Sequence, residues 1–131
     1  MKKVRGYVYS REFLGERCPQ HVQNIVIRDY CLKNNMRYLL SSVEYAMFNS
    51  FLILNEVVQE TLDIDGIVLY STFLMPSSEE HRLKIYDTVL NNKGEIHFAL
   101  ESLKITSFSE IDRIENIWKV RQALSNCIQQ V

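Results

Sequence analysis

Apolar and polar positions form their clearest pattern over residues 65–78. A turn there leads into a nearly continuous apolar run, which ends abruptly at Ser71 and Thr72 and continues through a proline-containing loop to a helix cap. A strand that is apolar on successive residues is covered on both faces, as are the central strands of a parallel α/β sheet. We therefore expect helices on both faces of a sheet that contains this strand.

Three further short segments are typical of strands, and the first two end in serine: Val4–Ser10, Met36–Ser42 and Glu95–Leu100. Helical segments separate all four strands, and this alternation predicts right-handed crossovers and a mostly parallel sheet. The expected fold is one α/β domain over residues 1–131. Residues 1–102 would form a four-stranded sheet with helices on both faces, and residues 109–131 a long C-terminal amphipathic helix.

Apolar residues at helical spacing predict the helices between the strands. The first covers about Gln20–Asn34, and the second carries its apolar residues within 51–62. The third is capped by Ser77 or Ser78, since a serine oxygen can accept from a free N–H group of the first turn. Spacing predicts the buried face of this third helix: Leu83, Tyr86 and Leu90.

The last helix, which Ser109 is predicted to cap, carries an apolar stripe wider than a small sheet needs. Two interpretations of this width stay open. The helix packs entirely on its own domain, or Trp118 and its neighbours also form a symmetric homodimer contact. The stripe consists of Ile111, Ile114, Ile117, Trp118, Val120, Leu124, Ile128 and Val131.

Composition excludes several classes of protein. The 15 basic and 16 acidic side chains give a formal charge of -1, so no global positive field attracts nucleic acid. Cys18, Cys31 and Cys127 are widely separated and odd in number, which argues against a disulfide framework and a zinc site. Three isolated histidines predict no metal site, and we expect no cofactor. Without a signal-peptide core or a membrane-length apolar run, the expected location is cytoplasmic.

Polar side chains follow every predicted strand. Because parallel sheets place ligands beyond the carboxyl ends of their strands, these side chains predict a binding site at that edge. Serine also ends strands for structural reasons, by bonding to local backbone, and this alternative stays open for each one. The predicted ligand contacts at the strand ends are Ser10, Ser71 and Thr72, with Ser41, Ser42, Glu101 and Ser102 at the same edge.

Arg11 and Arg17 flank a glycine-containing loop that leads into the first helix. Guanidinium groups and a helix N-terminus can together hold a phosphate or carboxylate. We therefore predict an anion site formed by Arg11, Arg17 and the N-terminus of this helix, where Gln20 is also a predicted ligand contact. The alternative is a solvated loop whose arginines pair with Glu12 and Glu16.

Three residues are candidates for proton transfer. Glu44 and Tyr45 follow the second strand and could act as a general base and an orienting phenol, or serve as a helix cap and a surface residue. His97 lies in the fourth strand, where alternation places it opposite Ile96 and Phe98. It is then either a hydrogen-bonded core residue or part of a pocket wall. No GxxxxGK[ST], GxGxxG or GxSxG motif is present.

Several motifs resemble the catalytic domain of serine recombinases (the resolvase/invertase family). They are a YxxS strand end at Tyr7–Ser10, glutamines at the start of the first helix, RDYC at Arg28–Cys31, and the DGIVLYS strand at Asp65–Ser71. The resemblance implies a resolvase-like fold. That family requires an arginine two residues before its serine and a DRxxR segment, whereas this chain has Val8 and Thr72–Pro76 there. Ser10 is therefore not predicted to be a nucleophile.

A second resemblance covers nearly the whole chain and is to sporadic carbohydrate cluster proteins, which are bacterial and encoded among genes for surface polysaccharide biosynthesis. It rests on short matching segments: Arg5–Tyr7, Ser10–Arg11, Pro19–Gln20, Val22–Asn24, Ile27–Cys31, Val43–Tyr45, Leu69–Ser71, Met75–Pro76 and His97–Glu101. This resemblance implies a role in carbohydrate biosynthesis without naming a reaction.

These observations lead to three hypotheses of function. The first is a protein that binds an anionic sugar derivative, a sugar phosphate or nucleotide sugar, at the carboxyl edge of the sheet, with or without modifying the sugar. The second is a non-enzymatic dimeric interaction or regulatory subunit of a polysaccharide biosynthesis enzyme. The third, which the charge balance disfavours, is a degenerate recombinase-like DNA binder.

Overall fold

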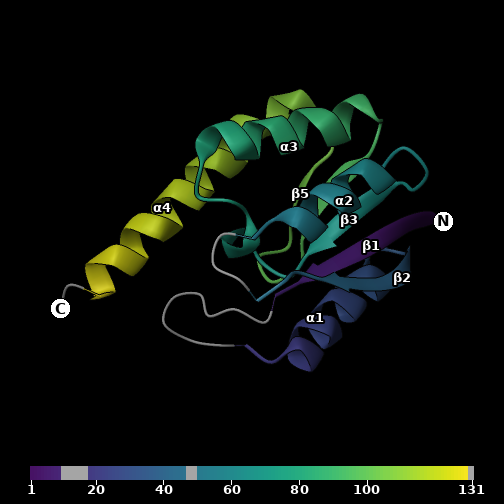
Figure 1. Cartoon of the computed structure of the whole chain (residues 1–131), viewed down its shortest axis with the longest axis horizontal. Coiled ribbons are helices and arrows are strands. Elements are labelled where there is room, and N and C mark those ends of the chain that lie inside the picture. The colour runs from purple at the N-terminus through teal and green to yellow at the C-terminus, as the bar shows by residue number, and fades with distance from the viewer. Residues whose placement is uncertain (10–17, 47–49, 130–131) are drawn as a thin grey trace.

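A five-stranded sheet with strand order β2-β1-β3-β4-β5 lies at the centre of the molecule (Figure 1). The structure, a computed structural model, describes residues 1–9, 18–46 and 50–129, and side chains as far as residue 123. β1 to β4 are parallel, and β5 runs antiparallel to β4. The strands are β1 (Lys2–Val8), β2 (Met36–Val43), β3 (Gly66–Leu69), β4 (Glu95–Phe98) and β5 (Leu103–Ile105).

The strand order places helices on both faces of the sheet. The chain steps from β1 outward to β2 and then crosses back over β1 to β3 and on to β4. Right-handed crossovers in opposite directions put α1 on one face and α2 and α3 on the other. Figure 1 shows α1 and α3 on opposite sides of the sheet. This arrangement confirms the predicted α/β fold; the helices are α1 (Gln20–Lys33), α2 (Leu52–Glu60), α3 (Glu79–Asn91) and α4 (Ile111–Gln129).

β3 is buried along its whole length, as its continuous apolar pattern predicted. It begins at Gly66, where a Cβ atom would lie 2.6 Å from the carbonyl oxygen of Glu95. Since that oxygen belongs to the backbone of the neighbouring strand, only glycine allows β3 and β4 to pair this closely. The core extends from this strand to both helical layers through residues such as Tyr7, Ile27 and Tyr86.

Two strand predictions need correction at their ends. The predicted fourth strand continues to Leu100, but β4 ends at Phe98 and the chain turns back into β5, which the sequence pattern missed. Three residues are too few to show a period. Ser41 and Ser42 do not close a strand either, because β2 continues to Val43 and pairs them with Gly6 and Tyr7.

The buried face of α3 differs from the predicted one. Tyr86 and Leu90 are buried as expected, but Leu83 is exposed and the charged Arg82 lies inside. Ser78 caps the helix by accepting a hydrogen bond from the His81 N–H group. Leu62 lies beyond the end of α2 and is exposed, while Ser109 belongs to a short 3₁₀ turn before α4 rather than to a cap.

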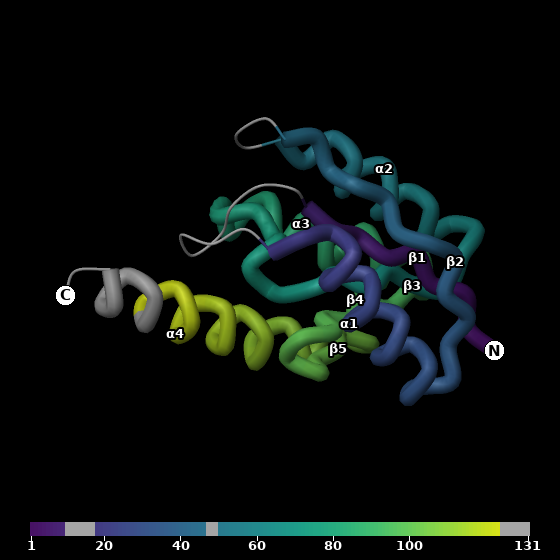
Figure 2. The backbone as a smooth tube through the Cα atoms, turned by 90° about the horizontal axis from the view of Figure 1, so that it is seen from below, coloured from purple at the N-terminus to yellow at the C-terminus, as the bar shows by residue number. Residues whose placement is uncertain are grey.

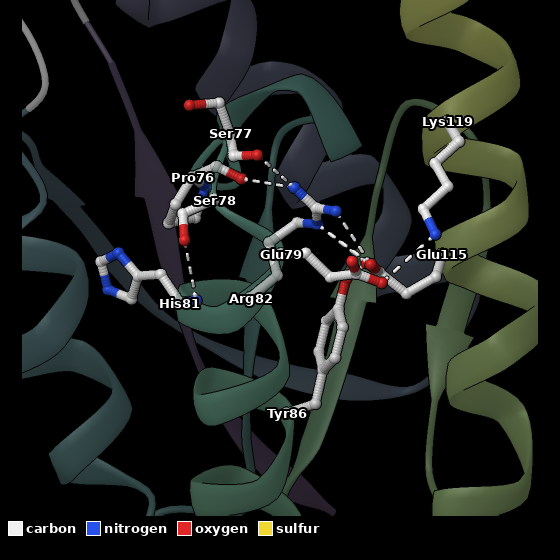
Figure 3. Close-up of polar contacts among 9 residues, drawn as sticks. All are labelled: Pro76, Ser77, Ser78, Glu79, His81, Arg82, Tyr86, Glu115 and Lys119. Carbon is white, nitrogen blue, oxygen red and sulfur yellow. Dashed lines mark hydrogen bonds and ion pairs between the residues drawn. The ribbon is translucent and has the colours of Figure 1, made fainter.

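α4 packs against α3 through a buried polar cluster, shown in Figure 3. The Arg82 Nε and Nη2 atoms donate to Glu115 at 2.9 Å, and Arg82 Nη1 donates to the carbonyl oxygens of Pro76 and Ser77. The Tyr86 hydroxyl donates to the same carboxylate at 2.8 Å. The Arg82 guanidinium also lies 3.6 Å from the centre of the Trp118 ring. We call Arg82, Tyr86 and Glu115 the inner cluster.

Beyond this cluster, α4 runs out past the sheet towards the C-terminus (Figures 1 and 2). Ile111 and Ile114 are buried at its beginning, whereas Val120 is 59% exposed. Among the stripe residues whose side chains the structure describes, burial is thus greatest at the start of the helix. The side chains of Leu124, Ile128 and Val131, which complete the predicted stripe, lie outside the described residues.

Candidate functional site

Ser71 and Thr72 meet the carboxylate of Glu101 at the carboxyl edge of the sheet. Oε2 of Glu101 accepts from the Ser71 hydroxyl at 2.8 Å, from the Thr72 hydroxyl at 2.7 Å and from the Thr72 N–H group at 3.0 Å. These contacts form because β3 ends at Leu69 and the chain tightens into a 3₁₀ turn that begins at Thr72. Two residues predicted to bind ligand therefore converge on one oxygen.

A fourth donor reaches the same oxygen from α4. Arg121 Nη1 forms an ion pair with Glu101 Oε2, and its guanidinium lies 4.3 Å from the centre of the Phe73 ring. The Glu101 side chain is 8% exposed and the Arg121 side chain 30%. We call Ser71, Thr72, Glu101 and Arg121 the carboxyl-edge cluster. It consists of two hydroxyls, one backbone amide and one guanidinium arranged around an anionic oxygen.

Arg121 is the functional candidate that sequence reasoning missed, whereas Glu101 had been placed at this edge. A signal for Arg121 exists, since it lies three residues after Trp118 and so on a neighbouring part of the helix surface. The spacing alone does not reveal which part of the sheet that surface approaches.

Glu44 follows β2 but points into the domain. One of its oxygens accepts from the Tyr7 hydroxyl at 2.8 Å and from the Leu54 N–H group at 3.1 Å. The other accepts from the Ser50 hydroxyl and from the N–H groups of Tyr45 and Ile53. The carboxylate is buried and caps the start of α2, so nearly all of its acceptor sites are used. The structure thus gives Glu44 the capping role, and a role as base stays a prediction.

Tyr45 and His97 do not join the carboxyl-edge cluster. Tyr45 is exposed beside the buried Glu44. His97 is buried in β4, but it lines a cleft together with Lys2 and Met36, the first residues of β1 and β2. The cleft therefore lies at the amino edge of the sheet. The three residues predicted to transfer protons consequently do not share one site.

The predicted anion loop falls in a part of the chain that the structure does not describe. Ser10, Arg11 and Arg17 lie outside the described residues, and Gln20 is half-buried in the first turn of α1. Gln23 is fully buried and holds both flanks of that loop. Its Nε2 atom donates to the carbonyl oxygens of Tyr9 and Cys18, both at 2.8 Å, and its Oε1 atom accepts from the Tyr9 N–H group.

The described residues contain no group of three side chains suited to hold a metal ion. Within the same ranges, no helix has the length and apolar character needed to cross a membrane.

Comparisons with known proteins find similarity in structure alone. Neither the models of known families nor the curated proteins give a significant match. The N-terminal catalytic domain of TP901-1 integrase matches with a TM-score of 0.67 and 14% identity, over 97% of this chain and 98% of that chain.

A resolvase family site-specific recombinase from Streptococcus pneumoniae matches with a TM-score of 0.63 and 9% identity, over 97% of each chain. At such identities the likeness shows the fold and not the activity. The chain therefore has the fold of resolvase-type recombinase catalytic domains, as its sequence motifs predicted.

Proposed function

We propose that the protein binds the phosphate group of an anionic sugar derivative, a sugar phosphate or nucleotide sugar, at the carboxyl-edge cluster. The observation that carries this proposal is the set of four donors on one oxygen of Glu101. Guanidinium groups, hydroxyls and backbone N–H groups bind phosphate oxygens as well as carboxylates. In the free protein, Glu101 would occupy the place that the ligand's phosphate takes.

The phosphate would displace the Glu101 carboxylate rather than bind beside it, because two anions on the same donors repel each other. Arg121 is partly open to solvent, whereas Ser71 and Thr72 are buried, so the ligand would meet Arg121 first. The displaced carboxylate would then accept hydrogen bonds from sugar hydroxyls. A ligand with both phosphate and hydroxyl groups would use every member of the cluster, and the setting in carbohydrate biosynthesis that the second sequence resemblance implies would supply such ligands.

The predicted contacts of Ser10, Arg11, Arg17 and Gln20 belong to the same proposal. Their support is the position of the residues beside them. The Tyr9 hydroxyl donates to the Leu74 carbonyl oxygen at 2.9 Å, in the 3₁₀ turn that also contains Thr72. The side chain of the residue before Ser10 thus reaches the turn that carries Thr72.

Isothermal titration calorimetry with inorganic phosphate, glucose 1-phosphate and UDP-glucose, at constant ionic strength, tests the proposal. Glu101→Gln removes the charge that competes with phosphate for the four donors. Phosphate binding should therefore tighten roughly 10-fold, which corresponds to about 1.4 kcal/mol. Arg121→Met should weaken binding by at least as much. Tighter binding of the two sugar compounds than of inorganic phosphate would identify the sugar as part of the ligand.

Lys119→Met is the matched control. Lys119 is also a cation of α4, but it pairs with the exposed Glu79 away from the cluster. Its loss should leave phosphate affinity unchanged. Equal effects of Lys119→Met and Arg121→Met, or no heat from any of the three ligands in the Glu101→Gln variant, would contradict the proposal.

The exposed part of α4 favours a second candidate function, a dimeric interaction or regulatory subunit of a biosynthetic enzyme. Val120, in the middle of α4, is exposed. Trp118 instead packs under Arg82 of its own chain, so replacing it would disturb the fold. Val120→Glu is therefore the sharper variant.

Light scattering of the wild-type protein and Val120→Glu decides this second candidate. A dimer that the substitution converts to a monomer would support it, and a wild-type monomer would contradict homodimerisation through α4. The DNA-binding hypothesis is the least favoured of the three, because the formal charge is -1 and a likeness at 14% identity extends only to the fold.

A further inference from the structure

The polar cleft that His97 lines, of about 330 Å³, lies at the amino edge of the sheet, opposite the carboxyl-edge cluster. Its polar lining comes from β1, β4 and β5 and from the turn after α1. The residues that matter for its chemistry are Lys2, Asn34, Asn35, Glu95, His97 and Lys104. A volume at the lower end of the range for ligand pockets suits a small molecule. None of these residues belongs to the carboxyl-edge cluster.

A chain of hydrogen bonds runs along one wall of this cleft. The Tyr30 hydroxyl lies 2.6 Å from His97 Nδ1, and His97 Nε2 lies 2.9 Å from Glu95 Oε2. An ionised carboxylate only accepts, so Nε2 carries the imidazole proton. Nδ1 of the neutral ring must then accept from the Tyr30 hydroxyl. Both nitrogens of the neutral ring are then occupied.

The cleft carries an excess of positive charge. Glu95 forms an ion pair with Lys2 through its other oxygen. Lys104 lies opposite His97 in the β4–β5 register and, among the described residues, has no ion-pair partner. Burial lowers the pKa of His97, the charges of Lys104 and Lys2 lower it further, and Glu95 opposes them. The field at the imidazole is thus set by two ammonium groups and one carboxylate.

We propose that this cleft binds a small organic anion, whose carboxylate or phosphate group pairs with Lys104 and whose neutral polar atoms contact the amides of Asn34 and Asn35. The anion supplies the negatively charged partner that Lys104 lacks among the described residues. Glu95 is already neutralised by Lys2 and therefore repels the anion less than a free carboxylate would. The site is distinct from the one proposed at the carboxyl edge, because the two lie at opposite ends of the parallel strands.

Binding of an anion has a measurable consequence at His97. The groups that face its ring are Tyr30 from α1, Lys2 from β1, Glu95 from β4 and Lys104 from β5. In the free protein, the positive charge of Lys104 opposes protonation of the His97 ring. A bound anion would compensate that charge. The pKa of His97 should therefore rise when the cleft is occupied, and by linkage the anion should bind more tightly as the pH falls through that pKa.

Nuclear magnetic resonance titration of the full chain with inorganic phosphate and, separately, malonate tests the proposal, with chloride at equal ionic strength as the reference. Amide shifts are expected at residues 34–35 and 103–105, together with an upward shift of the His97 pKa. Lys104→Met should weaken binding at least 10-fold, and its exposed side chain makes it safe for folding. The stronger of the two probes identifies the anionic group as phosphate or carboxylate.

Arg121→Met separates this site from the one at the carboxyl edge. This variant should leave the amide shifts at the amino edge intact, whether or not it abolishes phosphate binding at the carboxyl edge. Amino-edge shifts that chloride reproduces in full, or that persist unchanged in Lys104→Met, would overturn the proposal. So would an His97 pKa that neither phosphate nor malonate moves.

Discussion

Two carboxylates, Glu115 and Glu101, each receive an arginine across an interface with α4, yet their surroundings differ. The pair of Glu115 and Arg82 is closed, with side chains only 6% and 1% exposed. Tyr86 and two backbone carbonyls complete its hydrogen bonds. The pair of Glu101 and Arg121 is open on the arginine side, which is 30% exposed. A closed pair fixes helices in place, whereas an open one can exchange a partner, and this difference separates structure from candidate function.

The largest effect is expected at the inner cluster. Glu115→Leu would leave the Arg82 guanidinium buried without its carboxylate. Breaking a buried pair from one side costs about 3–5 kcal/mol because the remaining charge is uncompensated. The midpoint of urea unfolding, followed by circular dichroism, should fall accordingly with an unchanged slope.

Two variants sharpen this result. The double variant Arg82→Met with Glu115→Leu removes both charges and should recover most of the loss, since apolar replacements of buried pairs are often neutral. Glu79→Gln breaks only the exposed pair with Lys119 and should cost less than about 1 kcal/mol. A double variant as unstable as Glu115→Leu would show that the loss comes from packing rather than from charge.

Acidification should reveal the same cluster. Burial raises the pKa of Glu115, but hydrogen bonds from Arg82 and Tyr86 and the Arg82 charge outweigh burial and lower it below its ordinary value of 4.5. A lowered pKa in the folded state means that the stabilisation is present above pH 4.5 and is lost as the pH falls through the folded pKa. The stability difference between the wild-type protein and Glu115→Gln should therefore be constant near neutral pH and shrink below about 4.5. A difference that grows on acidification would contradict this assignment.

Glu44 is a third carboxylate with which to test the contrast. It is buried and accepts five hydrogen bonds, so Glu44→Gln would lose a charged acceptor and place an amide donor where only donors are found. Hydrogen bonds to charged groups contribute about 1.5–3 kcal/mol, and we expect a loss of that size in urea unfolding. A loss below about 0.5 kcal/mol, the level of ordinary surface substitutions, would contradict the capping role of Glu44.

The contrast also explains which features the sequence could predict. Local patterns were sufficient for the strand at Gly66–Leu69 and for the rim position of Ser71 and Thr72, because both depend on neighbours in the chain. The burial of Arg82 depends on Glu115, 33 residues away, and no periodicity records that pairing. The apolar pattern therefore placed Leu83 on the buried face of α3, where the structure has Arg82.

His97 shows the same limit within a strand. Alternation left two roles open for its side chain, in the core or in a pocket wall, and the structure shows it buried and hydrogen-bonded to Tyr30 of α1. Alternation does not predict at which end of the sheet the ring lies. Hydrogen bonds to Tyr30 and Glu95 hold it in the amino-edge cleft. Arg121 was missed for a related reason, because the apolar stripe predicts that α4 packs on the domain but not which edge of the sheet Arg121 approaches.

Among the carboxylates Glu115, Glu44 and Glu101, the smallest effect on stability is expected at Glu101. Glu101→Gln keeps an oxygen that can accept from Ser71 and Thr72, and Arg121 can turn to water when the charge is gone. The loss should be about 1 kcal/mol or less, which is the range for partly exposed pairs. Urea unfolding measures this loss, and calorimetry on the same sample measures phosphate affinity. A nearly unchanged stability together with tighter phosphate binding would mean that the carboxylate holds a binding site rather than the fold. A loss as large as that of Glu115→Leu would make the open pair structural after all, because its arginine would then depend on Glu101 as strictly as Arg82 depends on Glu115.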